Sequence, residues 1–424
     1  MSKNSTLPFR LIKLLTITLL LLVAGAISAQ DQESKSDFLN VFVDCNHCDI
    51  NFLRQEVDYL NYVRDRELAD VHVLVNNQPN GSGGNSYELN FIGLKEFEGT
   101  SQILSYNTTA NNTYDEVRSG LTKMIAVGMV PYISQTDLVD NLVVKVKDVE
   151  KKKKGKSSVP SGWNWNNWIF EVYGSGSLNQ ESSRKKVNLD YGTGADRITE
   201  DWRVTADLHF SYREQVIQGE DEVITTLRKR NSFFGRIARS VTDHWSAGMY
   251  SNIYMDSYRN IDMSSSFTPA LEYSLFPYTE VMKREITVRY QVGLTRQQYI
   301  ESTIYEKMAE DLMGQALVLS VRYRQPWGSV NGGVTASNYF HDFTKNRFSF
   351  NYNMNVRVVK GLSVRMSGYY NLIRDQLYLP QGEISTEDLL LSQTQVATDY
   401  EMGVSAGLAY NFGAMFNNTV NTRL

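Results

Sequence analysis

The fold is decided by a stretch that reads Trp202-Arg203-Val204-Thr205-Ala206-Asp207-Leu208-His209-Phe210-Ser211-Tyr212-Arg213. Apolar and polar residues alternate along its whole length. Because successive side chains of a β-strand point to opposite faces, the stretch predicts a strand with one apolar and one polar face. Its length is about twice the roughly 5–6 residues of an ordinary soluble strand. A tilted strand that crosses a bilayer needs about 9–11 residues, so the stretch suits a membrane-spanning strand.

The same alternation recurs about twelve times between residues 167 and 413, most clearly in 348–358, 362–371 and 402–412. The mean hydropathy of the chain is only −0.35, but strands of this kind hide their apolar residues from any window average. The chain has only 8 Pro, a residue that cannot donate to a strand ladder. The sequence therefore predicts a mainly β fold, an antiparallel transmembrane β-barrel of about 12 strands preceded by a small α/β domain.

The connections between the predicted strands differ in length at the two ends of the barrel. The short ones fall at Thr199–Asp201, Val241–His244, Pro277–Arg284, Arg324–Gly328 and Val359–Gly361. The long ones include Glu214–Val223, Gln297–Gln315 and Ile373–Thr398. Outer-membrane barrels have short periplasmic turns and longer external loops, so the pattern predicts that the N-terminal domain lies in the periplasm.

The tryptophans give an independent indication of the same topology. The chain has 6 of them. All lie at the starts of odd-numbered strands, counted from the first predicted strand, namely Trp163, Trp165, Trp168, Trp202, Trp245 and Trp327. Amphipathic rings favour the membrane interface. We therefore predict that the six form a periplasmic aromatic girdle.

The N-terminus has the features of an export signal. Three basic residues precede and flank the apolar run from Leu14 to Ala24, and small residues follow, with a plausible cleavage site after Ala29. Residues 1–29 are thus predicted to be a signal peptide. Together with the barrel they predict an outer-membrane protein of a Gram-negative cell envelope.

Residues 38–147 are predicted to form the periplasmic α/β domain, with the element order β-α-β-β-β-α-β. Asp49 is placed to cap the first helix, and Thr113 to Glu116 match a capping box at the start of the second. The last strand is expected at Leu142–Val146. Residues 148–166 form a Lys-rich linker, read either as a solvated tether or as a contact for anionic lipid headgroups. Residues 414–424 form a C-terminal tail.

Cys45-Asn46-His47-Cys48 is the sharpest local motif and stands just before a predicted helix. Three interpretations remain open: a structural disulfide in an oxidising compartment, a redox pair, and two ligands of a metal site that would need further ligands. We expect the possible disulfide and predict no metal and no cofactor.

Charged residues recur on the predicted polar faces of the strands. The predicted lumen-lining residues are Arg203, Asp207, His209, Arg213, Glu272, Glu285, Arg289, Arg322, Arg324, Arg357, Arg365 and Glu401. They could form a network of paired charges that fills a narrow barrel. They could equally line an aqueous pore, which the mixed signs would make weakly selective.

The chain also resembles an uncharacterised family of Gram-negative outer-membrane β-barrel proteins. The resemblance rests on Asn61–Asp65, Ala69–Val73, Arg197–Trp202, Arg324–Gly328 and Ile373–Pro380. It covers both the N-terminal domain and the barrel, and it implies an envelope location. The N-terminal domain is, in addition, weakly similar to the α/β domain at the start of TolB-type periplasmic proteins, which implies a protein-interaction role.

These observations predict a porin-like pore or a structural envelope protein whose periplasmic domain binds another envelope component. Outer-membrane lipid is the other expected partner, and a net charge of −4 gives no reason to expect nucleic acid. An enzyme is not expected, but a lipid hydrolase using His209 with nearby Ser211 is the alternative from another class. A third possibility is an anchor or assembly component of a secretion or envelope complex.

Overall fold

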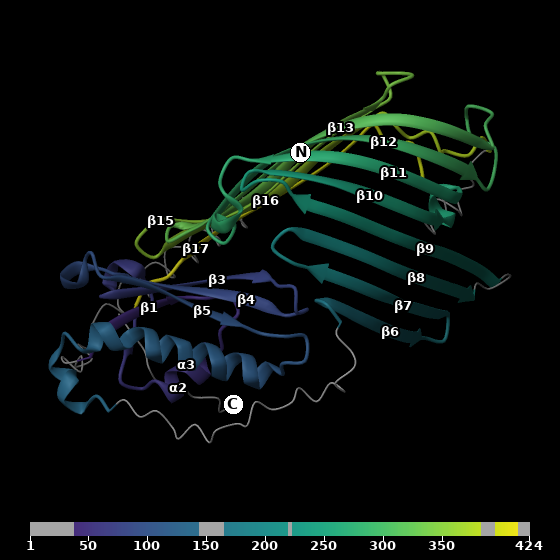
Figure 1. Cartoon of the computed structure of the whole chain (residues 1–424). Coiled ribbons are helices and arrows are strands. Elements are labelled where there is room, and N and C mark those ends of the chain that lie inside the picture. The colour runs from purple at the N-terminus through teal and green to yellow at the C-terminus, as the bar shows by residue number, and fades with distance from the viewer. Residues whose placement is uncertain (1–37, 144–164, 219–222, 383–394, 414–424) are drawn as a thin grey trace, which may run out of the picture.

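The computed structural model describes residues 38–143, 165–218, 223–382 and 395–413, which form two parts, a small α/β domain and a large antiparallel sheet (Figure 1). The predicted signal peptide, nearly all of the linker, Trp163 and the C-terminal tail lie outside these residues. Within the described parts of the chain, no helix has both the length and the hydrophobicity needed to cross a membrane.

The α/β domain is a five-stranded sheet with two helices on one side (Figure 1). Its elements are β1 (Asn40–Asp44), α2 (Ile50–Glu56), β2 (Asn61–Tyr62), β3 (Val71–Pro79), β4 (Asn85–Gly93), β5 (Ser101–Asn107) and α3 (Tyr114–Ile133), with 3-10 turns η1 (Arg66–Leu68), η2 (Lys95–Phe97) and η3 (Asp137–Asn141). The sheet order is β2-β1-β3-β4-β5. β1 is parallel to both of its neighbours, and the other pairs are antiparallel.

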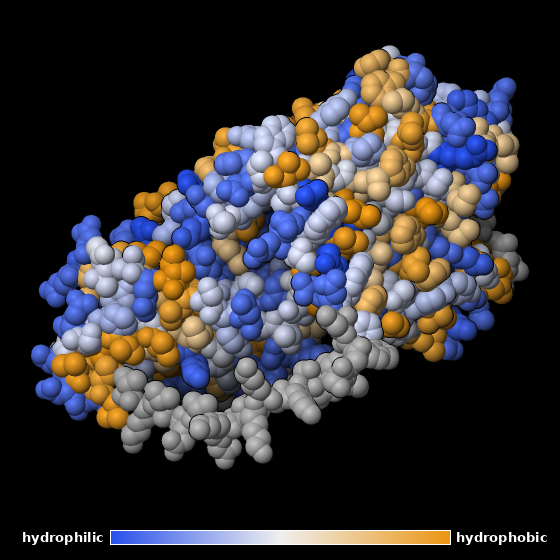
Figure 2. Space-filling view, viewed as in Figure 1, coloured by the Kyte–Doolittle hydropathy of each residue, from blue (hydrophilic) through white to orange (hydrophobic). Residues whose placement is uncertain are grey.

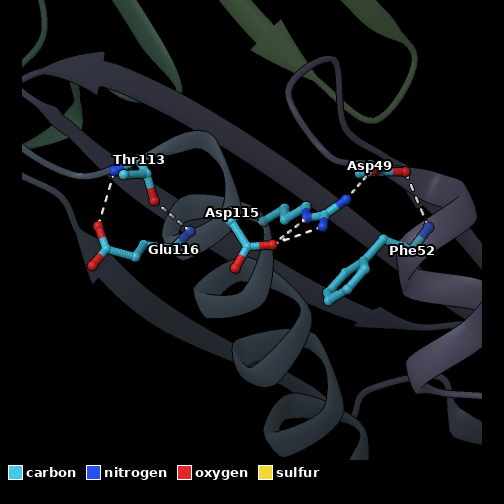
Figure 3. A network of polar contacts seen from close by, with 6 residues as sticks. Asp49, Phe52, Thr113, Asp115 and Glu116 are labelled. Atoms are coloured by element: carbon cyan, nitrogen blue, oxygen red, sulfur yellow. Dashed lines mark hydrogen bonds and ion pairs between the residues drawn. The ribbon is translucent and has the colours of Figure 1, made fainter.

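Both helices begin at the predicted caps. The Asp49 carboxylate accepts a hydrogen bond from the backbone N–H of Phe52 at 3.0 Å, and Thr113 and Glu116 complete the capping box. Arg118 on α3 then joins the two helix starts, because it donates to Asp115 at 2.7 Å and to Asp49 at 3.2 Å (Figure 3). Its guanidinium also lies 4.3 Å from the centroid of the Phe52 ring.

The two faces of the small sheet have different environments. Alternate residues such as Val71, Val73 and Leu89 point to the helices and belong to the hydrophobic core with Met129 of α3. The residues between them, including His72, are on the face that is turned toward the large sheet (Figure 1). This second face is therefore where the two parts of the molecule meet.

Two details of the α/β domain differ from the prediction. The 3-10 turn η3 follows α3, and Leu142 and Val143 belong to no element, whereas residues 144–146 of the predicted last strand lie outside the described residues. The edge strand β2 was not predicted, because two residues are too few to show an alternation. It is held in place by β1, with Asn61 opposite Asn40.

The large sheet has twelve strands in the order of the sequence, each antiparallel to the next. They are β6 (Trp168–Gln180), β7 (Arg184–Ile198), β8 (Trp202–Gln218), β9 (Val223–Ser240), β10 (Trp245–Asp256), β11 (Ile261–Ser274), β12 (Arg284–Tyr299), β13 (Ala309–Gln325), β14 (Gly328–Tyr339), β15 (Asn346–Val359), β16 (Leu362–Ile373) and β17 (Tyr400–Tyr410). The predicted fold class, a mainly β chain with a 12-stranded antiparallel sheet after a small α/β domain, is confirmed.

The hydrogen-bonded ladder of the large sheet ends at β6 and at β17. Among the described residues no pair joins these two edge strands. The closure of the sheet into a barrel therefore stays a prediction. An even number of antiparallel strands would let the two edges pair in the antiparallel sense found in bacterial barrels.

Several strands are longer than the sequence pattern predicts. The predicted loop at Glu214–Val223 is wrong, because β8 continues to Gln218 and β9 begins at Val223. The predicted loop at Gln297–Gln315 shrinks in the same way to residues 300–308. The apolar alternation stops where the predicted membrane ends, but ladder hydrogen bonds use backbone groups alone, so polar residues extend the strands beyond that point.

Candidate functional site

The predicted lumen residues lie together on one face of the large sheet. Residues directly opposite each other on neighbouring strands point to the same side, and the register can be followed from strand to strand. Arg289 lies opposite Glu272, and Arg322 lies opposite Glu285. The pairings from β8 to β17 place all the predicted lumen residues on this polar face, namely Arg203, Asp207, His209, Arg213, Glu272, Glu285, Arg289, Arg322, Arg324, Arg357, Arg365 and Glu401.

The opposite face of the large sheet is apolar and exposed. Leu208, Leu294 and Val404 are 39%, 55% and 72% exposed, and each belongs to the alternate set of its strand. Figure 2 shows hydrophobic residues, in orange, spread over the strands of this sheet. An apolar surface of this extent needs an apolar environment to cover it.

Some charges of the polar face are paired and others are not. Arg289 lies 3.9 Å from Glu272 and donates to the Tyr250 hydroxyl at 3.0 Å. Arg322 lies 3.0 Å from Glu285. Across the described parts of the chain, no ion pair is found for four of the predicted lumen residues, namely Arg203, Asp207, Arg213 and Arg365. Within the described residues, Glu401 accepts only a long hydrogen bond from Asn371, at 3.5 Å.

His209, the residue of the hydrolase alternative, is held by neighbours other than a serine. Its Nδ1 lies 2.8 Å from the Tyr173 hydroxyl, and its Nε2 lies 3.7 Å from the Asp190 carboxylate. Ser211 stands on the same face and opposite Asp190 in the register. A serine nucleophile needs a base within hydrogen-bond reach, and no hydrogen bond joins Ser211 to His209 among the described residues.

Two of the predicted lumen residues meet the α/β domain. Arg324, at the end of β13, donates to the backbone carbonyl of Asn77 at 2.7 Å. Arg357, near the end of β15, donates to the Asp44 carboxylate at 2.7 Å. Both lie at the rim of the large sheet, where the short turns are, and both contact β1 or β3 of the small sheet. We call this contact region the junction.

Two further contacts extend the junction. The backbone N–H of Gly361, in the turn between β15 and β16, donates to the Asp65 carboxylate. Lys283, just before β12, lies 3.8 Å from Glu88 on β4. No pattern in the sequence predicts these contacts, because the partners are more than 190 residues apart and belong to different parts of the molecule.

The α/β domain also reaches the first strands of the large sheet. The turn between β3 and β4 packs there so closely that a Cβ added at Gly81 would lie 3.0 Å from the Ile198 Cβ at the end of β7. A Cβ added at Gly83 would lie 3.8 Å from Ile169 of β6. The domain therefore spans from the β6 and β7 end of the rim to the β13–β16 turns.

Asp44 and His72 form the centre of the junction. His72 is fully buried, and burial lowers the pKa of its imidazole, so the ring is neutral at pH 7. Burial alone would raise the pKa of Asp44, but His72 and Arg357 beside it bring the pKa of this carboxyl down to about 2. The His72 Nε2 lies 3.7 Å from the Asp44 carboxylate, and the Arg357 guanidinium lies closer to it, at 2.7 Å.

A cavity of about 620 Å³ lies in the junction. One wall comes from β1, β3 and the Arg64–Glu67 segment, and the other from the β13–β14 and β15–β16 turns. Figure 2 shows mainly blue and white surface between the two parts of the molecule. The junction is therefore a polar interface that encloses space, and not a packed hydrophobic contact.

Cys45 and Cys48 are joined in a disulfide with an S–S distance of 2.06 Å. Both pack against the core between β1 and α2. Thiols that are joined in this way offer no thiolate to a metal. Among the described residues no cluster of three or more His, Cys, Asp or Glu could hold a metal ion.

The described tryptophans gather at the rim that faces the α/β domain. Trp168, Trp202 and Trp245 begin β6, β8 and β10, and Trp327 lies in the β13–β14 turn. Trp165 precedes β6 and is 46% exposed. This end of the large sheet therefore has both the short turns and the aromatic rings.

No family model matches the chain, and no curated protein matches it. The predicted family therefore stays a prediction. Solved structures that are similar include the NanC porin, with 9% identity, a TM-score of 0.28, and coverage of 58% of this chain and 99% of that chain. Another is the translocator domain of the autotransporter NalP from Neisseria meningitidis, with 13% identity, a TM-score of 0.24, and coverage of 58% and 87%. These similarities are too low to transfer a functional residue to this chain.

Proposed function

We propose that this chain is an outer-membrane β-barrel that forms a weakly selective aqueous pore, with the α/β domain lying across its periplasmic mouth. The observation that carries this proposal is the two-faced sheet. One face has exposed apolar side chains that suit lipid, and the other has charges of both signs that suit water. Outer-membrane lipid is then the partner of the apolar face.

The charges of the polar face favour a pore over a filled core. A filled barrel must pair its buried charges, whereas Arg203, Asp207, Arg213 and Arg365 stand outside the ion pairs of the described residues. Their mixed signs predict only weak preference between anions and cations.

The test is the single-channel conductance of the intact protein in planar bilayers, with folding verified by heat-modifiable gel mobility. Steady or fluctuating open conductance is the expected result. Protein that is verified as folded but conducts nothing would contradict the pore and would favour a structural or anchoring role.

Binding of another envelope component by the α/β domain remains a second candidate. The sheet face of the domain is already in contact with the rim, so a partner would use the helical side. Tyr114 and Val127 of α3 are 66% and 49% exposed there. Cross-linking of the intact protein in cell envelopes tests this candidate, with Val127→Glu expected to abolish a genuine contact and Lys123→Glu as the matched surface control.

The hydrolase alternative depends on His209. If it holds, His209→Ala abolishes a lipid-modifying activity while the protein keeps its heat-modifiable mobility. Unchanged activity in this variant, or no activity in the parent, would reject it.

A further inference from the structure

The cavity in the junction has an excess of positive charge. Its lining includes six basic residues, Arg64, Arg66, Arg324, Arg357, Lys360 and Arg365. Only three acidic residues line it, namely Asp44, Asp65 and Glu67. The whole chain, in contrast, has a net charge of −4. Positively charged side chains are therefore concentrated in this cavity, although the net charge of the whole chain is negative.

The acidic residues do not neutralise this excess. Asp44 is engaged by Arg357 at 2.7 Å, and Asp65 accepts from the backbone of Gly361. Glu67 is exposed. No ion pair is found for Arg64, Arg66, Lys360 or Arg365 within the described parts of the chain.

Hydrogen-bond donors in the cavity wall lack partners. Asn76 of β3 is only 5% exposed, and its Nδ2 is buried without a hydrogen bond. The Nε and Nη1 of Arg64 are also buried and unpartnered among the described residues. All three atoms are donors only, and buried polar groups are normally satisfied. The missing partner is therefore an acceptor.

We propose that the junction cavity binds a phosphate group through Arg64, Arg365 and Asn76. Planar guanidinium groups match the oxygens of phosphate in pairs, and these three residues come from different elements on both walls of the cavity. An anion held there bridges the α/β domain and the rim of the large sheet. The site goes beyond the proposed pore and does not depend on it, because binding requires only the junction.

The experiment measures binding of inorganic phosphate and of pyrophosphate to the intact, folded protein in neutral detergent, followed by calorimetry and by the fluorescence of Trp327, which also lines the cavity. Saturable binding is expected. The double variant Arg64→Gln with Arg365→Gln is expected to weaken it at least roughly tenfold, since hydrogen bonds to a charged group contribute that much or more.

The matched control is Arg213→Gln, which removes a cation from the same polar face outside the cavity. Binding that is unchanged in this control supports the site. Equal loss in the control and the double variant would overturn the proposal, because it would indicate general charge attraction. Binding that survives in the double variant would also overturn it, and so would a parent protein that binds neither phosphate, nor pyrophosphate, nor the short-chain lipid of the second arm described below.

The source of the phosphate group is decided by a second arm with soluble short-chain phosphatidylglycerol. If free phosphate and pyrophosphate saturate the site, the ligand is a periplasmic solute. If only the lipid binds, and binding depends on Arg64 and Arg365, the ligand is a lipid headgroup. Both results support a phosphate site, and conductance measurements on the same samples test the pore separately.

Discussion

His72 shows how a single residue links the junction to pH. It is fully buried on the face of β3 that meets the rim, and burial lowers the pKa of its imidazole. As the pH falls, the imidazole of His72 is protonated at a higher pH in the unfolded chain than in the folded protein. The residue therefore favours the folded state fully only above its unfolded pKa of about 6.5. That contribution is lost as the pH falls below this value.

We therefore expect the amides of β1 and β3 to exchange faster at pH 5 than at pH 7 after correction for the intrinsic rate. Hydrogen exchange with mass spectrometry measures this, and His72→Phe should flatten the dependence, since the ring packs 5.2 Å from Phe42. Arg66 and Arg357 also disfavour a charged His72, whereas Asp44 favours it. A dependence that persists in His72→Phe would show that another group is responsible.

The Asp44–Arg357 pair is the second prediction at this scale. The two side chains are 19% and 31% exposed, so solvent screens their attraction in part. A double-mutant cycle with Asp44→Asn and Arg357→Gln should give a coupling of about 1–2 kcal/mol in the unfolding free energy of the α/β domain. Urea titration of the intact protein provides the measurement, and additive effects would show that the contact stabilises nothing.

At the scale of elements, the start of α3 depends on residues that are close together in the sequence. Thr113 and Glu116 close a capping box at its start, which satisfies two backbone N–H groups. Thr113→Ala should destabilise the α/β domain by about 1 kcal/mol. The matched control is Ser119→Ala at an exposed position of the same helix, which should stay within about 0.5 kcal/mol. Equal effects in the two variants would contradict the role of the cap.

The length of each strand, in contrast, depends on its pairing with a neighbouring strand. β8 and β9 run for 17 and 18 residues because they pair with each other along nearly their whole length, from Trp202 opposite Arg239 to Gln218 opposite Val223. Alternation alone predicted where the strands lie, but it ended them where the apolar residues end. The extension is a property of the ladder and not of any one strand.

At the scale of the whole molecule, the first prediction is that the edge strands β6 and β17 pair and close the sheet into a barrel. If the sheet closes, β6 and β17 lie side by side and antiparallel. Val172→Cys combined in turn with Val404→Cys, Ala406→Cys and Leu408→Cys should then give a cross-link in at least one pair. Val172→Cys with Leu294→Cys, on the distant strand β12, is the control that should not react. Failure of all three pairs would mean that the sheet stays open.

The α/β domain across the rim gives the second prediction at this scale. Arg324→Gln with Arg357→Gln removes two contacts that hold the domain to the rim. If the domain obstructs the pore, the variant should conduct more, or stay open longer, than the parent protein. Arg213→Gln, on the polar face away from the junction, is the control. Identical traces for the parent and the junction variant would show that the domain does not gate the pore.

The sequence by itself determined the two-faced strands, their number and the helix caps of the α/β domain. These features depend on residues close together in the chain, such as the alternation from Trp202 to Arg213 or the box from Thr113 to Glu116. It also grouped the predicted lumen residues on one face of the sheet, since side-chain direction in a strand has a strict period of two.

Only the tertiary structure decided what those charges do. Arg324 and Arg357 were predicted as lumen residues, and they also contact the α/β domain, because folding brings β1 and β3 to the rim. The burial of His72, the polar cavity around Arg64 and the ion pair of Asp44 arise from the same long-range contact. Such contacts join residues up to 313 positions apart, and no local pattern of sequence records which of two distant surfaces will meet.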